Sequence, residues 1–353
     1  MKKPGRIWAG GTGVAVIGLL CWLIFRTPPP DTTPAKKPPP LEVAKPIATK
    51  PPDKPTEDWP KFGTLEFKKL ALERGGKWLA SRGRDAASLV AAWDITGEES
   101  LLEEAAEKFP NDPRVCMAMI ARYGVKESMP WIDRLIAAEP LNPEGFYLKA
   151  AAFKALKDNA AALEAIRTAV TMKGERDSHI TDRIMTVREA ALASGAGIRD
   201  AAQLALMAPF THTPIHSALN GMMVIPAELK AAVAAGDQDR IHDLAGLGLA
   251  AAERINHHST ILNELVSSTL EKGVLSQLPP DTAIGEAGTD VAERMRQADA
   301  RRASLMELMQ QSEEIASLHE SAPDSVIAEY TDRHILHGER AAMQWLLEQA
   351  PAK

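Results

Sequence analysis

The sequence predicts an all-α protein, and three observations support that fold class. Apolar residues recur every three or four positions in most segments after residue 62, which is the period of an amphipathic helix. Alanine is abundant and has the highest helix propensity. Aromatic residues make up only 5% of the chain, although strands favour aromatic and β-branched side chains. Closely packed helices are therefore expected rather than a sandwich of sheets.

The N-terminal segment is expected to anchor the chain in a membrane as a single transmembrane helix. Residues 7–25 read IWAGGTGVAVIGLLCWLIF and carry no charge, and about 20 apolar residues span a bilayer. The cations before the span are Lys2, Lys3 and Arg6, whereas only Arg26 directly follows it. This asymmetry predicts that residues 1–6 are a short cytoplasmic basic segment and that the body lies outside the cytoplasm, which is the periplasm if the organism is a two-membrane bacterium. A cleaved signal peptide is the alternative, but the run ends in bulky residues that make a poor cleavage site.

Residues 26–61 are predicted to be a disordered, proline-rich linker. Of the 33 residues at 28–60, 12 are proline, a composition that cannot build a packed core and favours extended polyproline II. At about 3.1 Å per residue such a tether reaches roughly 100 Å. A ligand for proline-binding domains is the alternative, but nothing in the segment points to a particular partner, so a spacer is preferred.

The stretch PEGFYLKAAAFKALKDNAAALEAIRTAV at 143–170 predicts two helices packed as a hairpin. The first helix has Phe146, Ala150 and Phe153 on one face, and the polar turn at 157–159 follows it. The second helix has small or aliphatic residues on one face; these are Ala162, Ile166, Ala169 and Val170. Two helices approach closely only where side chains are small, so the alanines provide the close contact and the bulky residues fill the space around it.

This spacing resembles the tetratricopeptide repeat, whose pattern is W-x2-L-G-x2-Y followed by A-x3-F, A and P. Phe146 matches the first aromatic residue, Ala150 the glycine and Phe153 the tyrosine. Ala162, Ile166 and Ala169 match the second half. Lys149 and Gly174 depart from the pattern, because the family usually has leucine and proline there.

Two weaker copies upstream end at Pro110 and Pro140 and are followed by NDP and LNP turns. Pro113 and Pro143 suit the first position of the helix that begins each next unit. Three degenerate repeats are therefore expected over about residues 78–175, inside a repeat domain at 62–210. Helices at 177–194 and at 201–207, the latter ended by Pro209, are expected to cap them.

The C-terminal region, 211–353, is expected to contain long antiparallel helices. Apolar or small residues from Ile241 to Thr269 keep a strict 3-4 spacing, which predicts one helix over 237–270, with Asp237 capping its start and Gly273 its end. Further helices are expected over 290–320 and 323–349, with a loop at 273–288 that contains two adjacent prolines. The first two should form a hairpin, and dimerisation through the seam is the alternative.

The resemblance implies that the first helix of each repeat faces a concave, partner-binding groove. In the best unit the groove-side candidates are Glu144, Tyr147, Ala151 and Lys154, with Tyr147 preferred. The asparagine–lysine clamp that some relatives use for carboxylates is missing, since Leu148 and Ala151 stand where polar groups would be needed. The groove would hold a protein or peptide partner.

No catalytic or cofactor motif stands out. The glycine-rich phosphate loops, the G-x-S-x-G elbow and H-E-x-x-H are missing from the sequence. His334 and His337 have the i, i+3 spacing that can share an ion, but no third ligand can be named, so surface or seam histidines are the preferred interpretation. Cys21 and Cys116 form no disulfide framework or zinc motif. Residues 1–60 have a net charge of +4, which leaves −10 for the rest, and an acidic body argues against nucleic acid.

These features favour a membrane-anchored helical-repeat protein that acts as an interaction scaffold outside the cytoplasm, without a cofactor. The first alternative is an assembly subunit of a cell-envelope complex that uses the long C-terminal helices, with homo-oligomers possible. A hydrolase or metal enzyme with a scattered site is the less favoured alternative, because many active sites leave no local signature.

Overall fold

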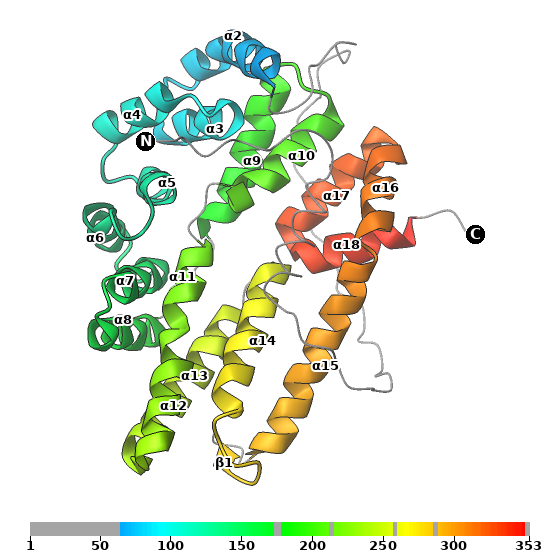
Figure 1. The fold of residues 1–353 in the computed structure, drawn as a ribbon. Helices are drawn as coiled ribbons and strands as arrows, with labels where there is room; N and C mark the ends of the chain where they lie inside the picture. The colour runs from blue at the N-terminus through cyan, green and yellow to red at the C-terminus, as the bar shows by residue number, and fades with distance from the viewer. Residues whose placement is uncertain (1–63, 173–177, 212–214, 257–259, 285–288, 350–353) are drawn as a thin grey trace, which may run out of the picture.

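The computed structural model confirms the all-α fold class. It describes residues 64–172, 178–211, 215–256, 260–284 and 289–349. In these ranges the strands are β1 (Ala283–Ile284) and β2 (Thr289–Asp290), which pair antiparallel at one end of the molecule (Figure 1). The predicted basic segment 1–6, membrane helix 7–25 and linker 26–61 lie outside the described residues.

Helix α2 (Leu65–Ser81) is followed by three helical hairpins stacked in a column along one side of the molecule (Figure 1). The hairpins are α3 (Ala86–Thr96) with α4 (Glu99–Lys108), α5 (Pro113–Tyr123) with α6 (Met129–Ala138), and α7 (Glu144–Ala155) with α8 (Asn159–Thr171). The helices predicted in 143–170 are thus confirmed, and the polar turn at 157–159 separates α7 from α8.

The sequence begins and ends these helices with ordinary capping residues. Asp85, Asp112 and Asp158 each accept a hydrogen bond from a backbone N–H in the first turn of the next helix, which satisfies a donor that the helix itself leaves open. Pro113 occupies the first position of α5, where no backbone N–H is needed. Gly97 ends α3 in the left-handed conformation, with φ of 65°.

Four further helices run along the inner side of the column (Figure 1). They are α9 (Ser178–Ala193), α10 (Ile198–Thr211), α11 (Ile215–Met222) and α12 (Val224–Ala235). Helix α9 packs on α2, α3 and α10, whereas α11 packs on α7. The helix predicted over 177–194 is confirmed as α9. Helix α10 continues past Pro209, which was expected to end it.

Each long helix predicted in the C-terminal region is divided in two. The 237–270 segment contains α13 (Gln238–Asn256) and α14 (Ile261–Leu275), which pack on each other. Thr260 has extended backbone angles and caps α14 through its hydroxyl oxygen, so the helix starts anew there. Asp237 does cap α13, but Gly273 lies inside α14 instead of ending it, where it passes close to the Pro226 ring.

The two remaining long helices break in the same way. Segment 290–320 forms α15 (Val291–Gln310) and α16 (Ser312–Ser321), which are separated by a turn at Gln311. Segment 323–349 forms α17 (Asp324–His337) and α18 (Glu339–Glu348), with Gly338 at φ of 84° between them. The expected packing of the first long segment against the second is retained, because α14 contacts α15.

The largest core cluster joins the stacked hairpins to the helices that follow them. It contains buried side chains of α5 to α8, such as Ile120 and Ile166, together with side chains of α11 to α15, such as Leu229 and Val274. A second cluster joins α2 to α5 with α9 and α10. Residues before and after position 210 therefore share one hydrophobic core.

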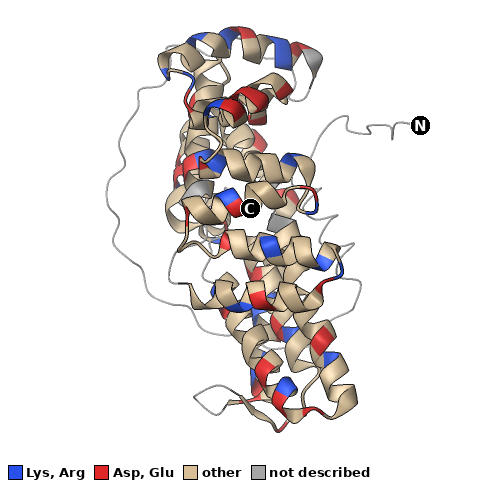
Figure 2. Cartoon of the chain, turned by 90° about the vertical axis from the view of Figure 1, so that its left-hand side faces the viewer, with Lys and Arg blue, Asp and Glu red and all other residues tan. Residues whose placement is uncertain are grey.

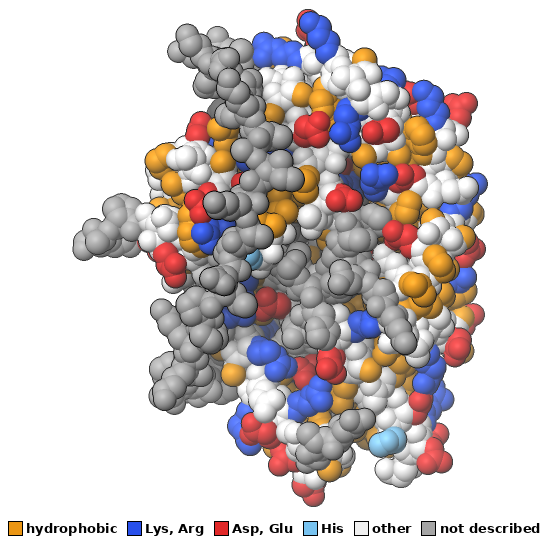
Figure 3. Space-filling view, turned by 180° about the vertical axis from the view of Figure 1, so that it is seen from behind, with side chains coloured by type: hydrophobic (Ala, Val, Ile, Leu, Met, Phe, Trp, Pro, Cys, Tyr) orange, Lys and Arg blue, Asp and Glu red, His pale blue; other side chains and the backbone are white. Residues whose placement is uncertain are grey.

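The described surface mixes charges of both signs. On the side formed by the hairpins, basic and acidic residues are interspersed along the helices (Figure 2). From behind, hydrophobic side chains form small groups among charged ones (Figure 3). Within the ranges described, one stretch, Ser217–Ala235, has the length and hydropathy of a membrane span, and 44% of its most apolar window is buried inside the molecule. Core helices of soluble proteins can have the same length and hydropathy as a membrane span.

Candidate functional site

The residues expected to hold the best hairpin together lie in the core. Ala150, Ala162, Ile166 and Ala169 are all fully buried. Phe146 and Phe153 are partly buried and pack against the same cluster. Alanine at the helix contact with larger side chains around it is the arrangement that the spacing predicts.

The groove face of α7, by contrast, is covered by the chain itself. Tyr147 is fully buried, and Glu144 and Ala151 are only 5% and 6% exposed. Lys154 is half-buried and donates hydrogen bonds to the carbonyl oxygen and, at 2.9 Å, to Oδ1 of Asn220 on α11. A partner cannot reach Tyr147 or Ala151 while α11 stays in this position.

Gly221 explains how α11 comes so close to α7. A Cβ atom at this position would lie 2.7 Å from the backbone nitrogen of Ala151 and 2.9 Å from its Cα. Real Cβ atoms do not come within 3.0 Å of such atoms, so only glycine allows this approach. No motif predicts this pair; its one local sign is a glycine inside an apolar helix.

Helices α9 and α11 leave a cavity on the inner face of the column, at the level of the second hairpin. The cavity measures about 40 Å³, which is room for roughly three water molecules or one short side chain. Its walls come from α3, α5, α6, the turn that follows α6, α7 and α9. The lining residues are Ala87, Val90, Ala91, Arg114, Met117, Leu135, Glu139, Asn142, Glu144, Ile180, Arg183 and Thr186.

The arginines that line the cavity are paired with carboxylates. Arg183 Nε donates to Asp94 at 2.7 Å, and this pair is almost entirely buried. Arg114 makes two hydrogen bonds to Asp112, at 3.0 and 2.8 Å. Burial alone would raise the pKa of Asp112, but the hydrogen bonds from Arg114 outweigh it and the pKa is lowered.

The turn between α6 and α7 provides a second polar wall. Asn142 donates from Nδ2 to Glu139 at 2.8 Å, and its Oδ1 accepts from the backbone N–H of Glu144 at 3.0 Å. These bonds fix the turn that begins α7. The cavity lining thus combines apolar side chains with charged groups that already have partners.

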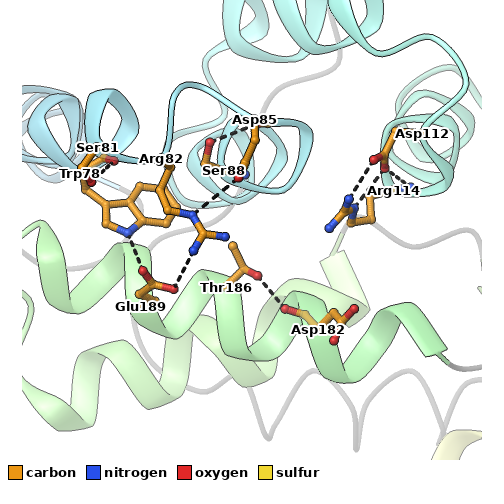
Figure 4. A network of polar contacts seen from close by, with 10 residues as sticks. All are labelled: Trp78, Ser81, Arg82, Asp85, Ser88, Asp112, Arg114, Asp182, Thr186 and Glu189. Carbon is orange, nitrogen blue, oxygen red and sulfur yellow. Dashed lines mark hydrogen bonds and ion pairs between the residues drawn. The ribbon is translucent and has the colours of Figure 1, made fainter. Parts of the chain in front are cut away.

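A polar network fastens α9 to the first helices (Figure 4). Trp78 Nε1 donates to Glu189 Oε1 at 3.0 Å, and Arg82 lies 3.8 Å from the other oxygen of the same carboxylate. Arg82 also faces Asp85, at 3.6 Å. Deeper along α9, the Thr186 hydroxyl donates to the carbonyl oxygen of Asp182.

The two histidines considered as metal ligands differ in environment. His334 is buried, 8% exposed, whereas His337 is exposed. Among the residues that the structure describes, no group of three or more His, Cys, Asp or Glu side chains could hold a metal ion. Cys116 is fully buried, and burial raises the pKa of its thiol to about 11.

Comparison with protein-family models, with curated proteins and with solved structures finds no significant match. The resemblance to tetratricopeptide repeats therefore rests on the residues of 78–175 alone.

Proposed function

We propose that this protein is a membrane-anchored scaffold of degenerate tetratricopeptide-like repeats that binds a protein or peptide partner outside the cytoplasm. The uncharged segment 7–25 would be the single membrane span, and the proline-rich linker would hold the helical body away from the bilayer. The stacked hairpins of α3 to α8, with prolines at the repeat boundaries, support the repeat interpretation.

The observation that carries this proposal is the cavity between α3, α5 and α9. Its lining includes the apolar side chains of Val90, Met117 and Ile180 together with a few polar groups. An apolar hollow with a few placed polar groups is the usual form of a recognition site. Because α9 and α11 fill the inner face on either side, a partner would insert one side chain here and would not lie along the whole groove. Tyr147, the preferred contact from the sequence, would then serve packing.

A substitution that fills the cavity tests this proposal. Ala87→Leu adds bulk to a cavity-lining position on α3, and Ala137→Leu makes the same change at an exposed position of α6. Each full-length variant is crosslinked in its own membranes and isolated with its partners. We expect Ala87→Leu to lose a crosslinked partner that wild type and Ala137→Leu retain. Identical partners for all three chains would contradict a binding site in the cavity.

Assembly through the C-terminal helices is a second candidate, because α15 lies along one edge of the molecule (Figure 1) and packs along its length on α14. Its exposed side contains Arg296, Ala300, Ala303 and Glu307. The seam at 237–270 is used for packing of α13 on α14 within the chain, which favours the scaffold. Light scattering of the purified full-length protein distinguishes the two candidates, since assembly through α15 requires an oligomer.

A further inference from the structure

The hairpin of α17 and α18 rests on the start of α14 through a core cluster of its own. Tyr330, Ala342 and Leu346 of the hairpin pack with Ile261 and Leu265 of α14. Leu305 and Leu308 of α15 and Ile315 of α16 belong to the same cluster. The contact joins the last two helices of the structure to the middle of the chain; α17 also packs on α10, and α18 on α16.

A buried carboxyl group lies at this contact. Glu339, the first residue of α18, is 4% exposed, and its Oε2 accepts a hydrogen bond from the backbone N–H of Ile261 at 2.9 Å. Ile261 is the first residue of α14, so a side chain of one helix satisfies an open donor of another. Burial raises the pKa of Glu339 to about 7, and the negative charge of Glu264 also raises it.

A buried imidazole lies on the same hairpin. His334 of α17 is 8% exposed, and its Nδ1 has no hydrogen-bond partner in the part of the chain that the structure describes. Its ring stands edge-on to Tyr330, with centroids 6.5 Å apart. Burial lowers the pKa of His334 to about 4. Burial without a partner for Nδ1 therefore disfavours a positive charge on this ring.

Other titratable groups around the pair are themselves paired or buried. Arg340, next to Glu339 on α18, turns to Glu264 of α14 at 3.0 Å and to Ser304 of α15 at 2.7 Å. The Tyr330 phenol has its pKa raised, first by burial and then by Glu339. Beyond Tyr330 lies His319 of α16, 5.9 Å away between centroids.

Charged groups also face the hairpin from α9 and α10. Burial lowers the pKa of His319, and the nearby guanidinium of Arg199 on α10 lowers it further. Arg199 donates to the carbonyl oxygens of His319 and Ala322 at the end of α16. On α9, Arg188 pairs with Asp332 of α17 at 2.6 Å. None of these cations is paired with Glu339 in the described contacts.

We propose that Glu339 and His334 form a compensated pair that keeps the α17–α18 hairpin docked on α14 with nearly constant strength from mildly acidic to mildly alkaline solution. Burial in the docked state favours the neutral form of each group. A rise in pH favours the undocked state through Glu339, and a fall in pH favours it through His334. The two effects oppose each other, so removal of either group should reveal the other.

The pKa values set the size of each effect. The docked state raises the pKa of Glu339 from 4.5, so its stabilising effect is complete at low pH and is lost as the pH rises through about 7. The docked state lowers the pKa of His334 from 6.5, so its effect is complete at high pH and is lost as the pH falls through about 4. As the pH rises from 5.5 to 8, Glu339 alone would increase the equilibrium constant for undocking about 25-fold, and His334 alone would decrease it about tenfold. Together they leave a change of about threefold.

Hydrogen exchange of the full-length protein tests this proposal. Protection factors of the α17 and α18 amides are measured at pH 5.5 and pH 8, after division by the intrinsic rate at each pH. From pH 5.5 to pH 8 we expect the protection factors to fall about threefold in wild type. They should rise about tenfold in Glu339→Gln and fall about 25-fold in His334→Phe. Gln retains an acceptor for the Ile261 N–H, and Phe retains the ring against Tyr330.

His337→Phe is the matched control, because it makes the same change three residues away at an exposed site and should behave like wild type. His334→Gln replaces His334→Phe if the larger ring prevents folding. The proposal is overturned if Glu339→Gln and the His334 variant show the same pH dependence as wild type. A 25-fold fall in wild type would also overturn it, because His334 would then not compensate.

Discussion

The close approach of α11 to α7 can be tested with a single added methyl group. In Gly221→Ala the new Cβ would lie 2.7 Å from the backbone nitrogen of Ala151, where ordinary contact begins at 3.4 Å. The two helices must therefore separate by up to about 0.7 Å, the difference between these distances. A change of side-chain rotamer cannot relieve this clash, because the nearest atoms belong to the backbone.

The expected cost follows from two opposing effects. Overpacking of a core contact costs about 1–3 kcal/mol, and the upper half applies where backbone atoms clash. Alanine gains about 1 kcal/mol over glycine inside a helix. We expect a net loss of about 1–2 kcal/mol in the free energy of unfolding. For a body of this size that is a fall in the melting temperature of roughly 2–6 °C.

Gly246→Ala is the matched control. Gly246 is exposed in α13, and a Cβ there would meet no atom within 4 Å. We expect this variant to be more stable than wild type by about 0.5–1 kcal/mol. Both variants are unfolded in urea and by heat, with helix content followed by circular dichroism. If Gly221→Ala is stabilised as much as Gly246→Ala, then α11 does not lie against α7 as described.

Three further substitutions or modifications test other parts of the core. Gly248→Ala should destabilise the chain by about 1–2 kcal/mol, because its Cβ would lie 2.4 Å from Val274 Cγ2; Val274→Ala should recover part of this loss in the double variant. Burial raises the pKa of the Cys116 thiol to about 11, so Cys116 should resist thiol reagents at pH 8 in the folded protein and react in urea. Mass spectrometry locates the label, and rapid labelling of Cys116 in the folded protein would contradict its burial. Glu271→Gln should cost about 2–3 kcal/mol in urea unfolding, because the 5% exposed carboxylate accepts from Arg294 at 2.8 Å and also pairs with Arg301. Both arginines would lose the negative charge that they pair with, so unchanged stability would show that the group is not buried.

Local patterns in the sequence predict the hairpin of α7 and α8 well, because helix period and capping residues act over a few positions. Asp158 caps α8, and the alanines meet at the contact. The same reasoning joins α13 and α14 into one long helix. Both helices face one core, so the 3-4 spacing continues past the point where Thr260 starts a new helix.

The groove could not be predicted, since its filling depends on contacts between residues far apart in the chain. Tyr147 has the spacing of a groove residue, but α11, about 70 residues later, covers it. A partner helix from another protein would bury the same face, and the local sequence of α7 is the same in both cases. The cavity likewise depends on where α9 and α11 leave a space, which no motif specifies.

The covering of α7 by α11 is tested most directly by a zero-length crosslink. Lys154 Nζ lies 2.9 Å from Oδ1 of Asn220, so Asn220→Asp places a carboxylate within direct coupling distance. Burial lowers the pKa of Lys154, which favours the reactive amine. Carbodiimide treatment should join Lys154 to position 220 in this variant and not in wild type.

Lys149 and Asp133, 2.8 Å apart, provide the internal positive control for the coupling reaction. The account predicts that mass spectrometry finds both crosslinked peptides in the Asn220→Asp variant. Coupling of Lys149 to Asp133 without any coupling of Lys154 to position 220 would show that α11 does not cover the inner face of α7.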